Sequence, residues 1–285
     1  MLPSGEYVQL SAQLGRVIAP NPGPMTGSGT NTYVLARDAG NALAADGGDI
    51  TLIDPGPAIK EHVDTLLKLF GNRIKSIVVT HTHSDHSPAA ARLVAETGAV
   101  VYGATPAADA AYQDETFKAD LELQDDQLLE FDGVRLRAIH TPGHVSNHYC
   151  FLVENDGIVL TGDHLMNGST VVIIPPAGVM KDYIDSLQKL KNYKIAQFGP
   201  GHGDLMDHPI EIIDWTVKHR LTREDKVIEK LTALGASTLE QLTPAVYDDV
   251  DESLHFMASM SLWAHLIKLE TEQRALVQND VWSIA

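Results

Sequence analysis

Short apolar runs alternate with segments of helical spacing over roughly the first 208 residues. Runs rich in Val, Ile and Leu predict single strands, and two such runs joined by an Asp-Gly or Asn-Asp-Gly turn predict a hairpin. The predicted strands cover 49–54, 74–80, 99–103 and 194–199, and the hairpins cover 128–141 and 148–163. Helical spacing predicts helices over 58–70, 88–97 and 182–193. Strands that alternate with helices are typical of an α/β domain.

The pattern changes at about Pro209, where helical spacing takes over. It predicts helices over 210–234, 237–243 and 251–270, and then a small hairpin that turns at Asn279-Asp280. Helices followed by a hairpin are compatible with a winged-helix module. We therefore expect an α/β domain over 1–208 and a small, mainly helical, winged-helix-like domain over 209–285.

Length and composition agree with one large domain and one small one. The chain has 285 residues, and no apolar run is long enough to span a membrane. Its start, MLPSGEYVQL, lacks the basic and apolar stretches of a signal peptide, and its single cysteine excludes an internal disulfide. We therefore expect a cytoplasmic protein without a membrane partner.

The charge of the chain bears on its partners. The net charge is −17, and by count residues 211–285 hold 7 Lys and Arg against 13 Asp and Glu. Proteins that bind duplex DNA usually present a basic stripe, and no run of Lys and Arg occurs here. We expect the C-terminal domain to serve as packing, as a lid or as a homodimer contact, and not to bind duplex DNA.

Titratable side chains cluster directly after the predicted strand 74–80, in the stretch HTHSDH. His81 and His83 are two residues apart, and in extended backbone such side chains point the same way and can reach one ion. Asp85 and His86 follow at a predicted helix start, where they can face a second point nearby. The alternative is a solvated histidine-rich loop. We prefer a metal site, because burying unpaired polar groups beside an apolar strand costs several kcal/mol.

Three further candidate ligands lie just beyond predicted strand ends and beside glycines. His144 lies in TPGH, Asp163 in TGD and His202 in GPGHG. Loops at strand ends are where sheet-based folds build their sites. Imidazole with carboxylate suits zinc, and manganese and iron are alternatives.

The motifs LIDPG, HTHSDH, TPGH, TGD and GPGHG occur in an order that resembles the metallo-β-lactamase superfamily over residues 15–208. The resemblance implies a four-layer αβ/βα sandwich with two sheets face to face. It also implies a ligand set for two ions. One ion is held by His81, His83 and His144, the second by Asp85, His86 and His202, and Asp163 bridges both. Asp54 is expected to orient ligands without binding metal.

Two further stretches resemble one branch of that superfamily, the β-lactamase-like protein 2 subfamily with its C-terminal winged helix. They are NPGPMTGSGTNTYVL at 21–35 and KHRLTREDKVIEKL at 218–231. The named mitochondrial member of that subfamily is an endoribonuclease of single-stranded RNA. The resemblance therefore implies a metal-dependent hydrolase.

The chemistry expected of such a site is hydrolysis by a hydroxide that bridges the two ions. Asp85 and Asp163 are the predicted catalytic residues. We rank phosphodiester cleavage, as by an endoribonuclease, first. The alternatives are a small carbonyl substrate, either a thioester, a lactone or, last, a β-lactam, and a non-catalytic metal-binding protein. The substrate is accordingly single-stranded RNA or a small molecule.

Some side chains outside the ligand set are candidates for substrate contact. Thr30, Asn31 and Thr32 in the opening loop offer neutral donors to a phosphodiester, and Asn31 is also a candidate for supporting the ligands. His148, four residues after His144, either supports the metals or touches substrate, or is a strand histidine bonded locally.

Overall fold

The computed structural model describes residues 3–106 and 113–285. It divides into two units, and three stretches of the chain form the first. The first unit comprises Met1–Thr141, Asn147–Thr170 and Tyr193–Pro209. The second comprises Pro142–Ser146, Val171–Asn192 and Ile210–Ala285.

The first unit contains two sheets. The larger has seven strands in the order of the chain, antiparallel from β1 to β4 and parallel from β4 to β7. Its strands are β1 (Tyr7–Gln9), β2 (Leu14–Ile18), β3 (Asn31–Leu35), β4 (Ile50–Ile53), β5 (Ile74–Val78), β6 (Val100–Gly103) and β7 (Leu121–Glu122). The second sheet has the order β12-β11-β10-β9-β8. Its strands are β8 (Gln127–Phe131), β9 (Val134–His140), β10 (Tyr149–Val153), β11 (Ile158–Gly162) and β12 (Gln197–Pro200).

The two sheets pack face to face through a shared apolar core. Leu35 and Ile53 of the seven-stranded sheet and Phe151 and Leu160 of the five-stranded sheet belong to this one buried cluster. Buried strands of this kind read as continuous apolar runs, which is why β4, β5, β10 and β11 were evident in the sequence.

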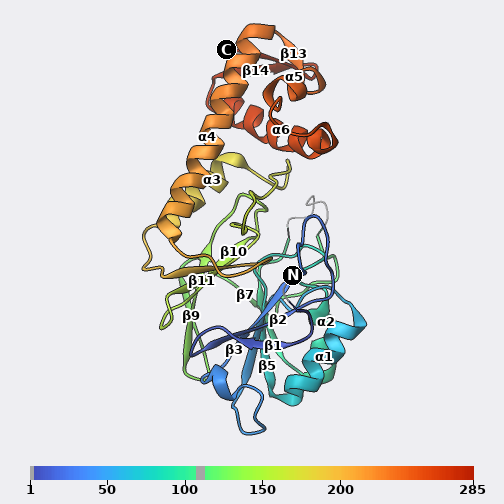
Figure 1. The fold of residues 1–285 in the computed structure, drawn as a ribbon, viewed down its shortest axis with the longest axis vertical. Coiled ribbons are helices and arrows are strands. Elements are labelled where there is room, and N and C mark those ends of the chain that lie inside the picture. The colour runs from blue at the N-terminus through green and yellow to red at the C-terminus, as the bar shows by residue number, and fades with distance from the viewer. Residues whose placement is uncertain (1–2, 107–112) are drawn as a thin grey trace. The chain divides into compact units, whose positions relative to one another are not determined.

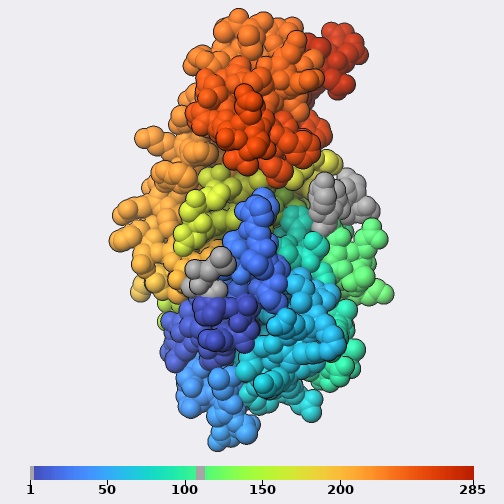
Figure 2. Space-filling model, turned by 45° about the vertical axis from the view of Figure 1, so that its right-hand side comes forward, coloured from blue at the N-terminus to red at the C-terminus, as the bar shows by residue number. Residues whose placement is uncertain are grey.

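Two helices cover the other face of the seven-stranded sheet. They are α1 (Lys60–Phe70) and α2 (Ala89–Thr97), which lie side by side (Figure 1). Leu66 and Leu93 of these helices pack with Ile77 of β5 in a second buried cluster. Figure 2 shows the N-terminal residues and the α1–α2 region, coloured from dark blue to cyan, next to each other on the surface of this unit. The predicted α/β sandwich is confirmed.

The second unit is mainly helical and ends in a small sheet. Its helices are α3 (Met180–Leu190), α4 (Pro209–Leu234, which starts at the last residue of the first unit), α5 (Leu239–Val246) and α6 (His255–Thr271). Its strands, in the order β13-β15-β14, are β13 (Ser237–Thr238), β14 (Ala275–Gln278) and β15 (Val281–Ile284). The β14–β15 turn is at Asn279-Asp280, both with positive φ, as a tight hairpin requires.

One apolar core holds the C-terminal helices and the hairpin together. Leu231 of α4, Leu242 of α5, Leu266 of α6 and Trp282 of β15 are buried in a single cluster. Thr238 and Gln241 form a reciprocal capping box at the start of α5. Among residues 3–106 and 113–285, no helix combines the length and apolarity needed to cross a bilayer.

Candidate metal centre

The candidate ligands of the first unit follow strands of both sheets. His81 lies three residues beyond the end of β5, in the seven-stranded sheet. Asp163 directly follows β11, and His202 lies two residues beyond β12, both in the five-stranded sheet. The face-to-face packing of the sheets therefore brings these loops to one place.

Asp85, His86 and His202 form one group. Their ligand atoms lie within 4.8 Å of one another. His202 Nε2 lies 3.2 Å from Asp85 Oδ2, and His86 Nε2 lies 3.6 Å from the same oxygen. Two ligands held about 2.1 Å from one tetrahedral ion lie roughly 3.4 Å apart. The spacing of this group therefore fits a single metal ion.

A second group adjoins the first. His81, His83 and Asp163 are members of a set whose ligand atoms lie within 4.8 Å of one another, and His81 Nε2 lies 3.0 Å from His83 Nδ1. Asp163 also reaches the first group, because its Oδ1 lies 3.5 Å from His86 Nε2 and 3.4 Å from His202 Nε2. One carboxylate thus lies between two clusters of ligands.

The outer ring nitrogens of two of these histidines have protein partners, which leaves the inner nitrogens for a metal. His86 Nδ1 lies 2.8 Å from Asp54 Oδ2, and His202 Nδ1 lies 3.4 Å from the Gly29 carbonyl oxygen. Such partners fix the ring orientation of metal-binding histidines. His86 Nε2 is buried and makes no hydrogen bond to a described residue. A buried nitrogen of this kind is costly unless an ion occupies its lone pair.

Asp54 contacts the candidate metal centre through the ring of His86. It follows β4 with a φ of 52°, a conformation that Asp tolerates better than most residues. Its Oδ1 accepts a 2.7 Å hydrogen bond from the Thr80 amide, and its Oδ2 accepts one of 2.7 Å from the Thr80 hydroxyl. Asp54 therefore joins the strand before the HTHSDH stretch to the His86 ring. Thr80 carries no separate signal in the sequence, and its place directly before His81 is the available hint.

The carboxylates make the centre attractive to positive charge. Burial alone would lower the pKa of His86, but Asp85, Asp163 and Asp54 together hold it well above the usual range. For Asp85, burial acts to raise the pKa, and the neighbouring His86 and His202 lower it overall. A bound cation would take over the role that a proton on His86 plays here.

Gly201 has no room for a side chain. A Cβ atom at this position would lie 2.8 Å from both Asp163 Oδ1 and His86 Cε1. The glycine in GPGHG thus allows the backbone to pass beside the ligands, which is a packing requirement that the sequence motif does not explain.

His144 lies in the segment Pro142–Ser146, which belongs to the second unit. Its Nδ1 lies 2.9 Å from the Val172 carbonyl oxygen, a contact of the kind that fixes the ring orientation of metal-binding histidines. Its role as a ligand stays a prediction from the sequence.

The opening-loop side chains do not offer donors to a substrate. Asn31 is buried and donates from Nδ2 to the carbonyl oxygens of Pro200 and Gly203, both at 2.8 Å, so it holds the loop that carries His202. Thr30 and Thr32 are also fully buried and bond to Asn21 and His62. The expectation of neutral donors here was wrong, because these three side chains are buried and already bonded within the protein.

His148 is bonded locally. It is fully buried, and its Nδ1 lies 2.9 Å from the Thr141 hydroxyl. Its ring lies 5.1 Å from that of His81, between centroids. These contacts fit a histidine that packs beneath the candidate ligands.

The fold and the paired clusters of ligands define a protein of the metal-binding hydrolase class. The chain belongs to the metallo-beta-lactamase superfamily, whose sequence profile matches residues 25–202. Residues 238–282 match the beta-lactamase associated winged helix domain. The predicted fold class, with its C-terminal winged helix, is thus confirmed.

Individual relatives cover most of the chain. A Drosophila melanogaster beta-lactamase-like protein 2 homolog is 29% identical over 95% of this chain and 92% of its own length. The atrochrysone carboxyl ACP thioesterase dmxR1 of Cryptosporiopsis sp. is 26% identical over 87% of this chain and 76% of its own. A solved metallo-beta-lactamase family protein from Thermus thermophilus superposes with a TM-score of 0.77 at 21% identity, over 96% of this chain and 99% of that one. The resemblance to β-lactamase-like protein 2 is confirmed over nearly the whole chain.

Proposed function

We propose that the protein is a hydrolase with two metal ions that cleaves phosphodiesters. One observation carries the proposal: two adjacent groups of ligands meet at one carboxylate, that of Asp163. Two ions a few Å apart clamp both the attacking and the leaving oxygen of a phosphodiester. We assign His81, His83 and His144 to one ion, Asp85, His86 and His202 to the other, and Asp163 to both.

The ions, zinc in our proposal, would lower the pKa of a water molecule and polarise the bond to be broken. The chain's own residues prepare the place for this chemistry. Asp85 and Asp163 set the spacing of the imidazoles around them, and Asp54 fixes the ring of His86. These three carboxylates carry less negative charge than two divalent ions carry positive charge. A loaded site therefore accepts an anionic phosphodiester even though the whole chain has a net charge of −17.

Thioester hydrolysis is the second candidate. The observation that favours it is the similarity to a relative named as an ACP thioesterase, which spans 87% of this chain. A metal pair can deliver water to a carbonyl as well as to a phosphorus centre, so the ligand set itself does not separate the two reactions.

Metal content is the first test. Protein prepared without chelators should carry close to two ions per chain by elemental analysis. A stoichiometry below one, with no activity regained on adding zinc, manganese or iron, would refute the ligand assignment.

A substrate panel is the second test, performed with one metal-loaded preparation. The panel is bis-p-nitrophenyl phosphate, single-stranded RNA, S-lactoylglutathione, an acyl lactone and nitrocefin. We expect the highest kcat/KM for a phosphodiester and the lowest for nitrocefin. Thioester or lactone turnover about a hundredfold above phosphodiester turnover, with RNA left intact, would favour the second candidate. This factor corresponds to roughly 2.7 kcal/mol of transition-state stabilisation.

A further inference from the structure

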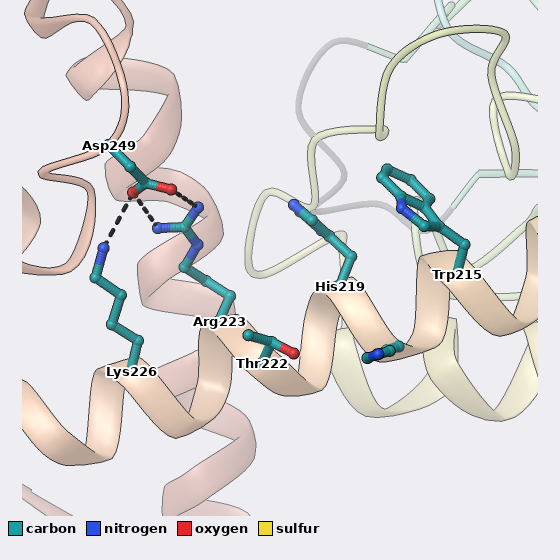
Figure 3. A pocket seen from close by; sticks show the side chains of 7 residues that line it. Trp215, His219, Thr222, Arg223, Lys226 and Asp249 are labelled. Atoms are coloured by element: carbon teal, nitrogen blue, oxygen red, sulfur yellow. Dashed lines mark hydrogen bonds and ion pairs between the residues drawn. The ribbon is translucent and has the colours of Figure 1, made fainter.

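The helix α4 carries most of the positive charge of the C-terminal region. Five of the 7 Lys and Arg residues in 211–285 lie between Lys218 and Lys230, all on this helix. Trp215, His219, Thr222 and Lys226 follow one another at intervals of three or four residues, so they share one side of the helix (Figure 3).

This side of α4 lines a pocket of about 380 Å³ within the second unit. The helix contributes Trp215, Lys218, His219, Thr222, Arg223 and Lys226, and the segment after α5 contributes Asp249. Pockets that bind small molecules usually fall between about 300 and 1,000 Å³. The pocket can therefore hold a molecule the size of a nucleotide.

An aromatic platform lies at one end of the pocket. The rings of Trp215 and His219 stack, with centroids 5.3 Å apart and planes inclined by 21°. Trp215 is 56% exposed, which is unusual for a large aromatic side chain. Burial and the cations of Arg220 and Arg223 lower the pKa of His219, so this residue presents a neutral ring near pH 7. The platform can accept a further planar ring.

Three cationic side chains lie beside this platform, two of them paired with Asp249. Arg223 donates to both oxygens of Asp249, at 2.7 and 3.0 Å, and lies over the ring of Tyr247. Lys226 also contacts Asp249, at 3.1 Å (Figure 3). Lys218 makes no ion pair with any described residue. The lining thus offers three cations against one carboxylate, and one of the cations is uncommitted.

We propose that this α4 pocket binds a nucleotide, with the base stacked on Trp215 and the phosphate against Lys218. Flat rings next to cations are the chemistry that binds unpaired nucleotides. The bases of a duplex are stacked inside it and cannot stack on Trp215. An acidic protein would contact the cations but would not need the exposed Trp215 ring. The nucleotide is either free or part of a single strand. The site lies wholly in the second unit, so the proposal does not depend on which bond the metal centre cleaves.

Calorimetric titration of the full-length, metal-loaded protein with AMP tests the proposal. We expect saturable binding that weakens about tenfold in Trp215→Ala, since stacking on one aromatic ring contributes on this scale, and that is partly recovered in Trp215→Phe. Lys218→Ala should weaken AMP binding and make it less sensitive to salt. Lys230→Ala is the matched control: Lys230 is on the same helix, pairs with Glu229 and does not line the pocket. It should bind AMP as the wild type does.

Parallel titrations with inorganic phosphate, a short single-stranded oligonucleotide, the same sequence as a duplex, and polyglutamate identify the ligand. Equal affinity for AMP and for the single strand indicates a free nucleotide as ligand, and tighter, Trp215-dependent binding of the strand indicates a nucleic acid. The proposal is overturned if AMP does not bind at millimolar concentration, or if Trp215→Ala binds it as well as the wild type. Phosphate that binds as tightly as AMP also overturns it, as does polyglutamate or duplex binding in place of AMP. Dependence on Trp215 distinguishes binding in the α4 pocket from binding or turnover at the metal centre.

Discussion

Asp54 Oδ2 lies 2.8 Å from Nδ1 of His86, on the side of the ring away from the other candidate ligands. We expect Asp54→Asn to lower metal affinity and kcat/KM by about 10–100-fold, as loss of such a supporting carboxylate typically does. Asparagine keeps the shape and tolerates the positive φ of 52°, so the fold should be retained. Competition with a chromophoric chelator measures the affinity. Unchanged zinc affinity would show that Asp54 serves the β4 turn alone.

Asp163 should matter to both ions, because its carboxylate contacts the two groups of ligands. We expect Asp163→Ala to retain less than one ion per chain and to lose most activity. Asp85→Ala, which removes a member of one group only, should retain close to one ion. Elemental analysis of the two variants beside the wild type separates the roles. If Asp163→Ala keeps two ions and full turnover, the shared carboxylate is not a ligand.

Gly201→Ala should damage the centre although it replaces no candidate ligand. The added methyl would lie 2.8 Å from Asp163 Oδ1 and from the His86 ring, far inside van der Waals contact, so one of the two must move. We expect a loss of metal and activity similar to that of a ligand substitution. Gly23→Ala is the control, because its Cβ would meet only the Thr26 hydroxyl, at 3.2 Å. Equal metal content in both variants would contradict the expected clash.

His62 should make stability depend on pH. Burial lowers its pKa to about 4 in the folded chain, although a hydrogen bond with the Pro55 backbone acts in the opposite direction. The unfolded chain binds a proton below about pH 6.5, which the folded chain accepts only near pH 4. The contribution is complete above pH 6.5 and is lost as the pH falls toward 4, by about 3 kcal/mol at most.

The comparison of Tm for wild type and His62→Gln isolates this effect. Both proteins should be measured after metal removal, so that protonation of the ligand histidines does not release metal during the titration. The Tm of the wild type should fall relative to that of His62→Gln as the pH is lowered from 6.5 to 4. A constant difference across this range would mean that His62 does not titrate as its burial implies.

The sequence predicts several of the buried strands and most helices because their apolar spacing is local, but the buried strands β2 and β3 were not predicted. The predicted strand 49–54 and helix 58–70 correspond to β4 and α1. The edge strand β1 was not predicted, because it is mostly exposed and acquires its conformation by pairing Tyr7 with Val17. The pairing partner of an exposed strand is set by the rest of the sheet, which no local pattern records.

The candidate ligands were evident in the sequence, but the residues that support them were less so. Histidines and aspartates after strand ends carry their own chemical signal. Thr80 and Gly201 act through distances between loops of two sheets, which exist only once the chain is folded. The opening-loop threonines show the opposite error, since their polar character suggested substrate contact although they are buried.

The positions of the candidate ligands on two different sheets have a mechanical consequence. His81 and His83 follow a strand of one sheet, while Asp163 and His202 follow strands of the other. An ion held by Asp85, His86 and His202 would cross-link positions more than a hundred residues apart, in a chain whose single cysteine excludes an internal disulfide. Such an ion would stabilise the folded state as a disulfide does in a secreted protein, by restricting the unfolded chain. Chelation should then act as reduction does on a disulfide-bonded domain, and amide exchange should quicken first where β5, β11 and β12 end.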